Sequence, residues 1–339
     1  MNRLIASCAM SIPQQRGDTM AYDVVALGEL LIDFACDRIN EDGYPTMTAH
    51  PGGAPANFLA TLAKFGAKTA MIGKVGKDAF GDLLLESLHK AGIDTEGMIK
   101  AEDAFTTLAF VTFDKTGDRQ FSFSRKPGAD TRLFVRDIDT DIISKTKVFH
   151  FGTLSLTCEP VRTATHFALS CAKEYGCLVT YDPNLRKPLW NNLETAKEQI
   201  VWGIQQADVV KISDEEVEFL FGPISYEDAA KKILCEFGCK LVFVTLGKNG
   251  CLFANKNACG TVAGLSGLKV IDTTGAGDIF GGAAVWKLLQ MEKQPEELNG
   301  KELEEITRFA CTAAGLSTQK SGGITSIPSY DEVLQQEQL

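Results

Sequence analysis

The segment Asp272-Thr-Thr-Gly-Ala-Gly-Asp278 stands immediately before an apolar stretch, Ile279 to Leu289, that has the length of a helix. A glycine turn that opens a helix exposes backbone N–H groups without intrahelical partners, and the helix dipole favours an anion there. We therefore expect the amides of Gly275 to Gly277 to face a phosphoryl group while Asp278 accepts a proton from a hydroxyl group. An ordinary capped helix N-terminus is the alternative.

A second glycine turn, Pro51-Gly-Gly-Ala-Pro-Ala-Asn57, leads into another apolar stretch that stops at Gly66. Pro55 suits the first turn of a helix, and a glycine commonly follows its last turn. The amide of Asn57 has both a donor and an acceptor for a sugar hydroxyl, and paired glycines allow a ligand to approach the backbone closely. A capped helix without a ligand is again the alternative.

The remaining pattern predicts an α/β fold. Short apolar runs typical of buried parallel strands begin at Val24, Thr69, Val148, Leu178, Val209 and Leu241. Helical patterns alternate with them, which predicts a sheet with helices on both faces. Asp33 to Ala49 and Phe105 to Ser124 alternate in polarity instead, with a hairpin turn at Asp114–Asp118, and predict a small separate sheet. An edge hairpin on the main sheet is the alternative.

Composition excludes several classes of protein. The 339 residues contain 34 Lys+Arg and 44 Asp+Glu, a net charge of -10, and no basic stripe, so we expect no nucleic-acid partner. Ten cysteines lie scattered without a Cys-x-x-Cys pair, which indicates reduced thiols and a cytoplasmic protein. No apolar run has the roughly 18 residues of a membrane span. We expect no membrane partner, and residues 1–20 to be a disordered extension.

The two glycine motifs resemble, in order, the signatures of the ribokinase-like family, also called the phosphofructokinase-B family of carbohydrate kinases. The resemblance spans nearly the whole chain, and Tyr181-Asp-Pro-Asn-Leu-Arg186 and Lys211-Ile-Ser-Asp-Glu-Glu216 are most similar to fructokinases. It implies a three-layer α/β/α fold with a mostly parallel central sheet and a small β-sheet lid over the sugar. The expected kinase domain is 21–330, with lid segments at about 34–50 and 104–125, followed by a tail at 331–339.

The resemblance also assigns roles to individual residues. For catalysis it implies Asp278, Gly275, Ala276 and Gly277. For sugar binding it implies Asp33, Gly52, Gly53, Asn57, Arg125 and Arg162, with Arg186 as a weaker candidate. For ATP binding it implies Asn184, Ser213, Glu216, Thr245, Gly247, Gly250 and Ala314. For Mg²⁺, held through water, it implies Glu216, and for a monovalent cation such as K⁺ it implies Asp272, Thr274 and Gly322.

The sequence departs from the family at two of these positions. Ser213 stands where the family has Asn, and a serine that caps an acidic helix start explains it as well. Ser124 and Lys126 flank Arg125 where fructokinases more commonly have Tyr and Asn. The turn Thr245–Gly250 follows a strand, and a simple hairpin is its alternative.

The leading hypothesis is an ATP-dependent fructokinase that phosphorylates O6 of the sugar. A 2-keto-3-deoxygluconate kinase, or another sugar kinase of the same family, is the alternative within the class. A catalytically silent sugar sensor is the alternative outside it, although a sensor does not need the base Asp278. A nicotinamide-dependent dehydrogenase is excluded because no Gly-x-Gly-x-x-Gly follows the first strand. A homodimer is compatible with the sequence, which does not determine the oligomeric state.

Overall fold

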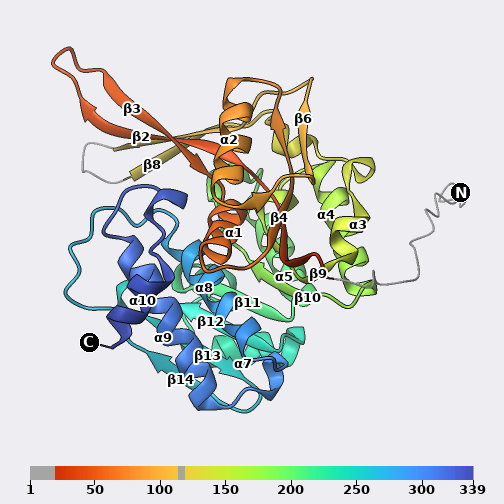
Figure 1. The fold of residues 1–339 in the computed structure, drawn as a ribbon, viewed down its shortest axis with the longest axis vertical. Coiled ribbons are helices and arrows are strands. Elements are labelled where there is room, and N and C mark those ends of the chain that lie inside the picture. The colour runs from red at the N-terminus through yellow and green to blue at the C-terminus, as the bar shows by residue number, and fades with distance from the viewer. Residues whose placement is uncertain (1–19, 114–118, 339) are drawn as a thin grey trace, which may run out of the picture.

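The computed structural model describes residues 20–113 and 119–338, which form a large sheet between two layers of helices, with a smaller sheet at one side (Figure 1). The large sheet has ten strands in the order β14-β13-β12-β11-β10-β9-β1-β4-β5, and β6 pairs with β4. These strands are β1 (Tyr22–Leu27), β4 (Thr69–Gly76), β5 (Ile93–Asp94), β6 (Met98–Ala101), β9 (Thr146–Gly152), β10 (Leu178–Asp182), β11 (Val209–Ser213), β12 (Leu241–Thr245), β13 (Cys251–Asn255) and β14 (Cys259–Val262). The six strands predicted from apolar runs are all present.

The strands of the large sheet pair in parallel except at one edge, where β13 pairs antiparallel with both β12 and β14. Alternate residues of each strand face opposite layers of helices. Val25 and Leu27 of β1 contribute to one core cluster, whereas Val24 and Ala26 contribute to the other. Because both faces are covered, most residues of the central strands are apolar, which is the pattern that made them recognisable.

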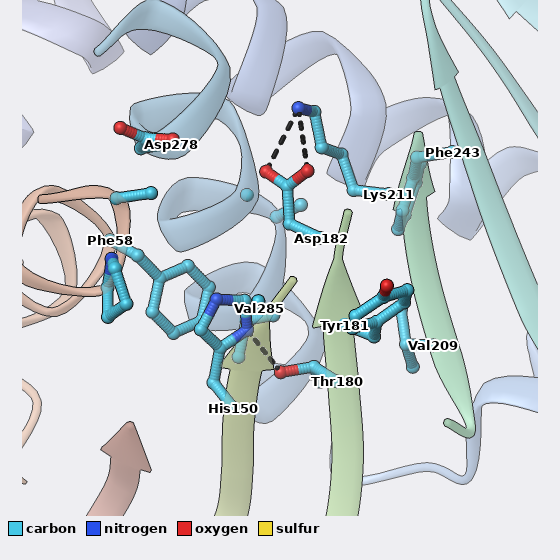
Figure 2. A pocket seen from close by; sticks show the side chains of 15 residues that line it. Phe58, His150, Thr180, Tyr181, Asp182, Val209, Lys211, Phe243, Asp278 and Val285 are labelled. Carbon is cyan, nitrogen blue, oxygen red and sulfur yellow. Dashed lines mark hydrogen bonds and ion pairs between the residues drawn. The ribbon is translucent and has the colours of Figure 1, made fainter. Parts of the chain in front are cut away.

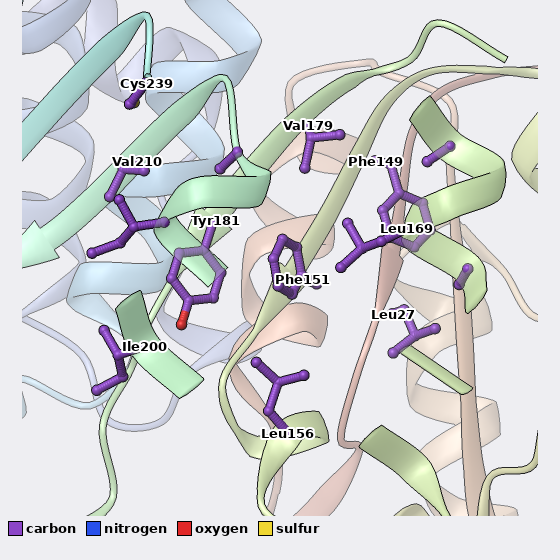
Figure 3. Packing of buried hydrophobic residues seen from close by; sticks show 14 of the residues in the cluster. Leu27, Phe149, Phe151, Leu156, Leu169, Val179, Tyr181, Ile200, Val210 and Cys239 are labelled. Carbon is purple, nitrogen blue, oxygen red and sulfur yellow. The ribbon is translucent and has the colours of Figure 1, made fainter. Parts of the chain in front are cut away.

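One face of the sheet carries α3 (Thr140–Ser144), α4 (Val161–Glu174), α5 (Leu193–Gln206), α6 (Asp214–Phe221) and α7 (Tyr226–Phe237). Figure 3 shows the packing on this face, where Phe149, Phe151 and Tyr181 lie at the centre of the cluster. The other face carries α1 (Ala54–Lys64), α2 (Ala79–Lys90), α8 (Ala276–Gln290), α9 (Gly300–Ser317) and α10 (Tyr330–Glu337).

The predicted small sheet is present as a separate unit. It consists of β3 (Pro45–Gly52), β2 (Leu31–Ile39), β7 (Leu108–Phe113) and β8 (Arg119–Ser124), paired in that order. The β2–β3 hairpin projects well beyond the helical layers (Figure 1). The ring of Phe34 packs on Phe80 of α2 and on Phe110 of β7, which joins the sheet to the main body. The predicted turn at Asp114–Asp118 lies outside the described residues, as do residues 1–19 of the expected extension.

The segment expected as a C-terminal tail, 331–339, is instead mostly helix α10. Ser329 and Glu332 form a reciprocal capping box, and Val333 is fully buried in the core between the sheet and its helices. The ring of Tyr330, which packs among aromatic rings of the same core, also contributes, so a capped start and a few apolar contacts dock this short helix. Within residues 20–113 and 119–338, no helix combines the length and apolar character needed to cross a membrane.

Candidate active site

Asp278 lies in the first turn of α8, where that helix begins against the large sheet. Its Oδ2 accepts a hydrogen bond from Nδ2 of Asn57 at 2.8 Å, and its Oδ1 accepts one from Nδ2 of Asn184 at 3.3 Å. Asn57 belongs to α1. Helix α8 approaches α1 closely at Gly282, which has no side chain; a Cβ there would lie 2.6 Å from the carbonyl oxygen of Phe58. Two amides from distant segments therefore hold both oxygens of one carboxylate.

The environment of Asp278 sets its proton affinity. Burial raises the pKa of its carboxyl group above the ordinary value, while the Asn57 hydrogen bond and the charges of Lys211 and Arg186 act in the opposite direction. Gly275, the N-cap of α8, lies in the left-handed region with φ of 77°, and a Cβ there would be 3.2 Å from Nδ2 of Asn57. The turn expected to bind the phosphoryl group (the anion cup) therefore lies beside the Asn57–Asp278 hydrogen bond.

Lys211 and Asp182 form an ion pair beside this carboxylate that sequence reasoning did not assign to the site (Figure 2). The Nζ of Lys211 lies 3.0 and 3.2 Å from the two oxygens of Asp182. The signal was present in the sequence: each charge interrupts an otherwise apolar strand, Val209-Val-Lys-Ile-Ser213 or Leu178-Val-Thr-Tyr-Asp182. A charge inside a buried strand has a partner or a function.

Asp33, on the small sheet, faces the same space from the opposite side. Burial raises the pKa of Asp33 to about 6; the Arg186 charge lowers it, and the charge of Asp278 raises it. A Cβ at Gly52 would lie 2.0 Å from Oδ2 of Asp33, so only glycine fits between β3 and this carboxylate. Asp33 is thus near enough to Asp278 for their charges to interact, Gly52 packs on Asp33, and Asn57 binds Asp278 directly.

Arg125 does not reach that group. Its Nε donates to Oδ2 of Asp130 at 2.7 Å, and its Nη1 and Nη2 donate to Thr157 Oγ1 and to the carbonyl oxygen of Leu154, each at 2.9 Å. Both members of the Arg125–Asp130 pair are almost fully buried. The expectation that Arg125 binds sugar or phosphoryl oxygens is therefore corrected, because internal partners already occupy its guanidinium group.

The partners of Arg125 lie where the chain passes between the two sheets. Arg125 follows β8, and Thr107, which precedes β7, donates its hydroxyl to Oδ1 of Asp130. Nearby, Glu29 precedes β2 and accepts from the amide of Ala54, which follows β3, at 3.0 Å. Burial raises the pKa of Glu29 to about 7, opposed by that amide and by the Arg125 charge. These polar contacts join the connections in two pairs, the start of β7 with the end of β8 and the start of β2 with the end of β3.

Arg162 also has a local partner. Its Nε donates to the carbonyl oxygen of Leu156 at 2.8 Å, a contact within the segment that leads into α4, and not with the Asp278 group. Arg186, the weaker candidate, is the arginine whose charge lowers the pKa of both Asp33 and Asp278. Arg186, which follows the motif at Asp182, therefore interacts with the charges of the site, whereas Arg162 on α4 has a local contact.

The predicted ATP residues lie at neighbouring strand ends. Ser213 and Thr245 are register partners at the carboxyl ends of β11 and β12. Ser213 caps α6 by accepting from the amide of Glu216 at 3.2 Å, and Oε2 of Glu216 accepts from the amide of Ser213 at 2.9 Å. Oε1 of Glu216 accepts from the amide of Leu185 at 2.7 Å. The serine cap that was the alternative explanation of Ser213 is thus present. The same contacts hold the Glu216 carboxylate near Asn184.

The turn from Gly247 to Gly250 joins β12 to the antiparallel strand β13, so it is a hairpin connection placed beside Ser213. Ala314 lies on α9, partly exposed, next to Gly315, where a Cβ would lie 3.0 Å from Cβ of Leu265. The small residues of α9 therefore accommodate the loop that leads toward α8.

The predicted cation residues are brought together. Oδ1 of Asp272 accepts from the amide and hydroxyl of Thr274 at 2.9 and 2.7 Å, and its Oδ2 accepts from the amide of Gly322 at 3.1 Å. These contacts bind the loop before α8 to the loop after α9. Oxygen-rich groups of this kind are the ligands preferred by hard cations.

Comparison with known proteins identifies the family. Residues 21–330 match the model described as pfkB family carbohydrate kinase. Fructokinase-2 of Solanum lycopersicum is 41% identical over 315 residues, which cover 92% of this chain and 94% of the relative. The structure of fructokinase from Xylella fastidiosa with bound ATP has a TM-score of 0.86 at 30% identity, covering 93% of this chain and 98% of that one.

A second solved structure, fructokinase from Vibrio cholerae O395 in a fructose, ADP and calcium ion bound form, has a TM-score of 0.83 at 31% identity, covering 93% of this chain and 99% of that one. The chain belongs to the pfkB family of carbohydrate kinases, phosphotransferases with an alcohol group as acceptor. The ribokinase-like fold predicted from the sequence is confirmed by these likenesses.

Proposed function

We propose that this chain is an ATP-dependent fructokinase that converts ATP and D-fructose to ADP and D-fructose 6-phosphate. The observation that carries the proposal is the Asp278 carboxylate, held by Asn57 and Asn184 in the first turn of α8. Relatives and structural neighbours named fructokinase support the choice of sugar.

The chain's own groups suffice for the proton step. Asp278 accepts the proton of the O6 hydroxyl as that oxygen bonds to the γ-phosphorus, while the bond from the γ-phosphorus to the bridging oxygen breaks and ADP leaves. The amides of residues 275–277 face the charge on the transferred group. Asp33 accepts hydroxyl hydrogens on the far side of the sugar, and Gly52 leaves room for its carboxylate.

Asn57 has a further acceptor for the sugar. Its Oδ1 is buried and, among the residues that the structure describes, has no hydrogen-bond partner. A buried amide oxygen without a donor costs about 1–3 kcal/mol, which a ligand hydroxyl would recover. Asn57 thus holds Asp278 through its nitrogen and offers its oxygen to the substrate.

Cations complete the proposed site. Glu216 fits a Mg²⁺ held through water, because its buried carboxylate is fixed by two amides and sits beside Asn184; Mg²⁺ would neutralise charge on the phosphates. Asp272, Thr274 and Gly322 fit a K⁺ ion that stiffens the loop before α8. Fructokinase of Vibrio cholerae has been described with a calcium or a potassium ion.

The contacts of Arg125 disfavour 2-keto-3-deoxygluconate as the acceptor. Such a substrate needs a cation for its carboxylate, and Arg125, the candidate for that role, is occupied by Asp130. The test is ADP formation with fructose, 2-keto-3-deoxygluconate, ribose, glucose and nucleosides at equal concentration. We expect the highest kcat/KM for fructose; a clearly higher value for another sugar would replace the assignment.

Three further expectations concern the domain, the oligomeric state and the cellular location of the protein. Residues 21–330 form one kinase domain with the small sheet as its lid, which the extent of the family match supports. A homodimer would cover Ile39 and Tyr44, which are exposed on the projecting hairpin, and light scattering would measure it. A cytoplasmic location is supported by free thiols such as Cys239 and Cys251, buried in the core.

A further inference from the structure

Lys211 occupies an unusual position for an ammonium group. It lies at the centre of β11, between core residues Val210 and Ile212, and its side chain is only 12% exposed. A lysine buried in this way loses its charge unless partners compensate the desolvation. Burial lowers the pKa of Lys211, but the charges of Asp182, Glu216 and Asp278 outweigh burial and raise it, so the ammonium stays protonated.

The ammonium also lies directly behind the anion cup. A Cβ built at Gly277 would be 3.0 Å from Nζ of Lys211, and Gly277 immediately precedes the base Asp278. Lys211, Asp182 and Asp278 line the same cavity of about 30 Å³, whose other walls are mostly apolar (Figure 2). With little water between them, charges in such a cavity interact more strongly than on the surface.

We propose that Lys211 is a positioning residue for phosphoryl transfer: its ammonium group, fixed by Asp182, keeps Asp278 ionised beneath the bound sugar and adds positive charge behind the anion cup. This inference rests on the proposed kinase function. Gly277 lets the ammonium lie this close to the helix start, because a Cβ there would be in tight contact with Nζ of Lys211.

Asp278 is surrounded by both cations and anions. Arg186 is a second cation that favours ionisation, but it comes from a loop and is only partly buried. Glu216 and Asp33 are anions that oppose ionisation. Asp182 is also an anion, whose pKa is raised by burial and lowered by Lys211. Lys211 is therefore the buried cation on which the charge of Asp278 depends.

The test is the pH dependence of kcat/KM for fructose at saturating MgATP. Its acidic limb reports ionisation of the base in the enzyme before the sugar binds. In Lys211→Met the limb should move to higher pH by about 1 unit, because an opposite charge at close range has been removed. In Asp182→Asn, which removes an anion, the limb should stay in place or move to lower pH. If the Lys211–Asp182 pair had only a structural role, the two variants would not shift the acidic limb differently.

Two further variants keep the test decisive. Lys147→Met breaks an exposed ion pair with Asp23 at the far end of the sheet and should leave the limb unchanged. If Lys211→Met does not fold, Lys211→Met combined with Asp182→Asn removes the pair without a net change in charge. Its limb should lie at higher pH than that of Asp182→Asn alone.

A direct measurement separates this inference from the proposed function. The carboxyl ¹³C signal of Asp278, assigned by its loss in Asp278→Asn, reports the pKa without any turnover. We expect that pKa to rise by about 1 unit in Lys211→Met, even if fructose proves not to be the substrate. An unchanged Asp278 titration, or a limb that stays in place while only kcat falls, would overturn the inference.

Discussion

Replacing Arg125 with methionine should destabilise the protein and leave fructose binding nearly intact. Methionine fills most of the aliphatic volume of arginine but removes the donors to Asp130, Thr157 and Leu154. The substitution therefore distinguishes a structural arginine at the base of the small sheet from the sugar-binding arginine that the sequence suggested.

The magnitude follows from burial. The side chains of Arg125 and Asp130 are 4% and 3% exposed, so the substitution leaves a carboxylate buried without its cation. Removing one partner of such a pair costs about 3–5 kcal/mol. The comparable pair Arg132–Asp103 is 37% and 56% exposed, and exposed pairs contribute about 0–1 kcal/mol. Arg132→Met is therefore the matched control.

The assay is urea unfolding at neutral pH, followed by calorimetric titration with fructose. Arg125→Met should lose several times more unfolding free energy than Arg132→Met. Adding Asp130→Asn should restore part of the loss, because the orphaned charge is removed. A stability loss below about 1 kcal/mol, together with a large loss of fructose affinity, would refute the structural role.

Three further outcomes are expected. Gly53→Ala should destabilise the protein in urea, because φ at Gly53 is 114° and the new Cβ would lie 2.4 Å from the carbonyl oxygen of Glu29. His150 is buried and its pKa is lowered to about 3 by burial and by Lys211. As the pH is lowered, His150 therefore takes up its proton at a higher pH in the unfolded state than in the folded state. The free energy of unfolding should decrease below about pH 6.5 by up to about 1.4 kcal/mol per pH unit. His150→Gln should flatten that slope in urea unfolding. Replacing Na⁺ by K⁺ at constant ionic strength should raise kcat, and equal rates would count against the cation site.

The strands and the core of the site could be predicted because their signals are local. A run such as Val24 to Gly28 can be recognised without knowing its neighbours, since a strand covered on both faces is mostly apolar. Asp278 and Asn57 each stand at the start of a helix behind a glycine turn, so each motif indicated its own function. Their 2.8 Å hydrogen bond spans 221 positions of sequence, and only the fold reveals it.

The errors and omissions have a common physical cause. Arg125 and Lys211 are both buried cations, and their roles depend on which carboxylate the fold places beside them. Asp130 is five residues from Arg125 and binds it, whereas Asp182 lies in the strand beside Lys211 and comes from another part of the chain. Helix α10 in the expected tail was not predicted, because a few contacts of Val333 and Tyr330 with the core dock it. Sequence periodicity does not report such single contacts.

The central claim is that Asp278 is the general base, and the turnover of Asp278→Asn tests it most directly. Asparagine keeps the size of the side chain and caps a helix about as well as aspartate, but it cannot accept the proton. A positioned base contributes about 10²- to 10⁴-fold in rate, so kcat for fructose should fall at least within that range while the calorimetric affinity for fructose persists. Near-normal kcat in Asp278→Asn would contradict the mechanism.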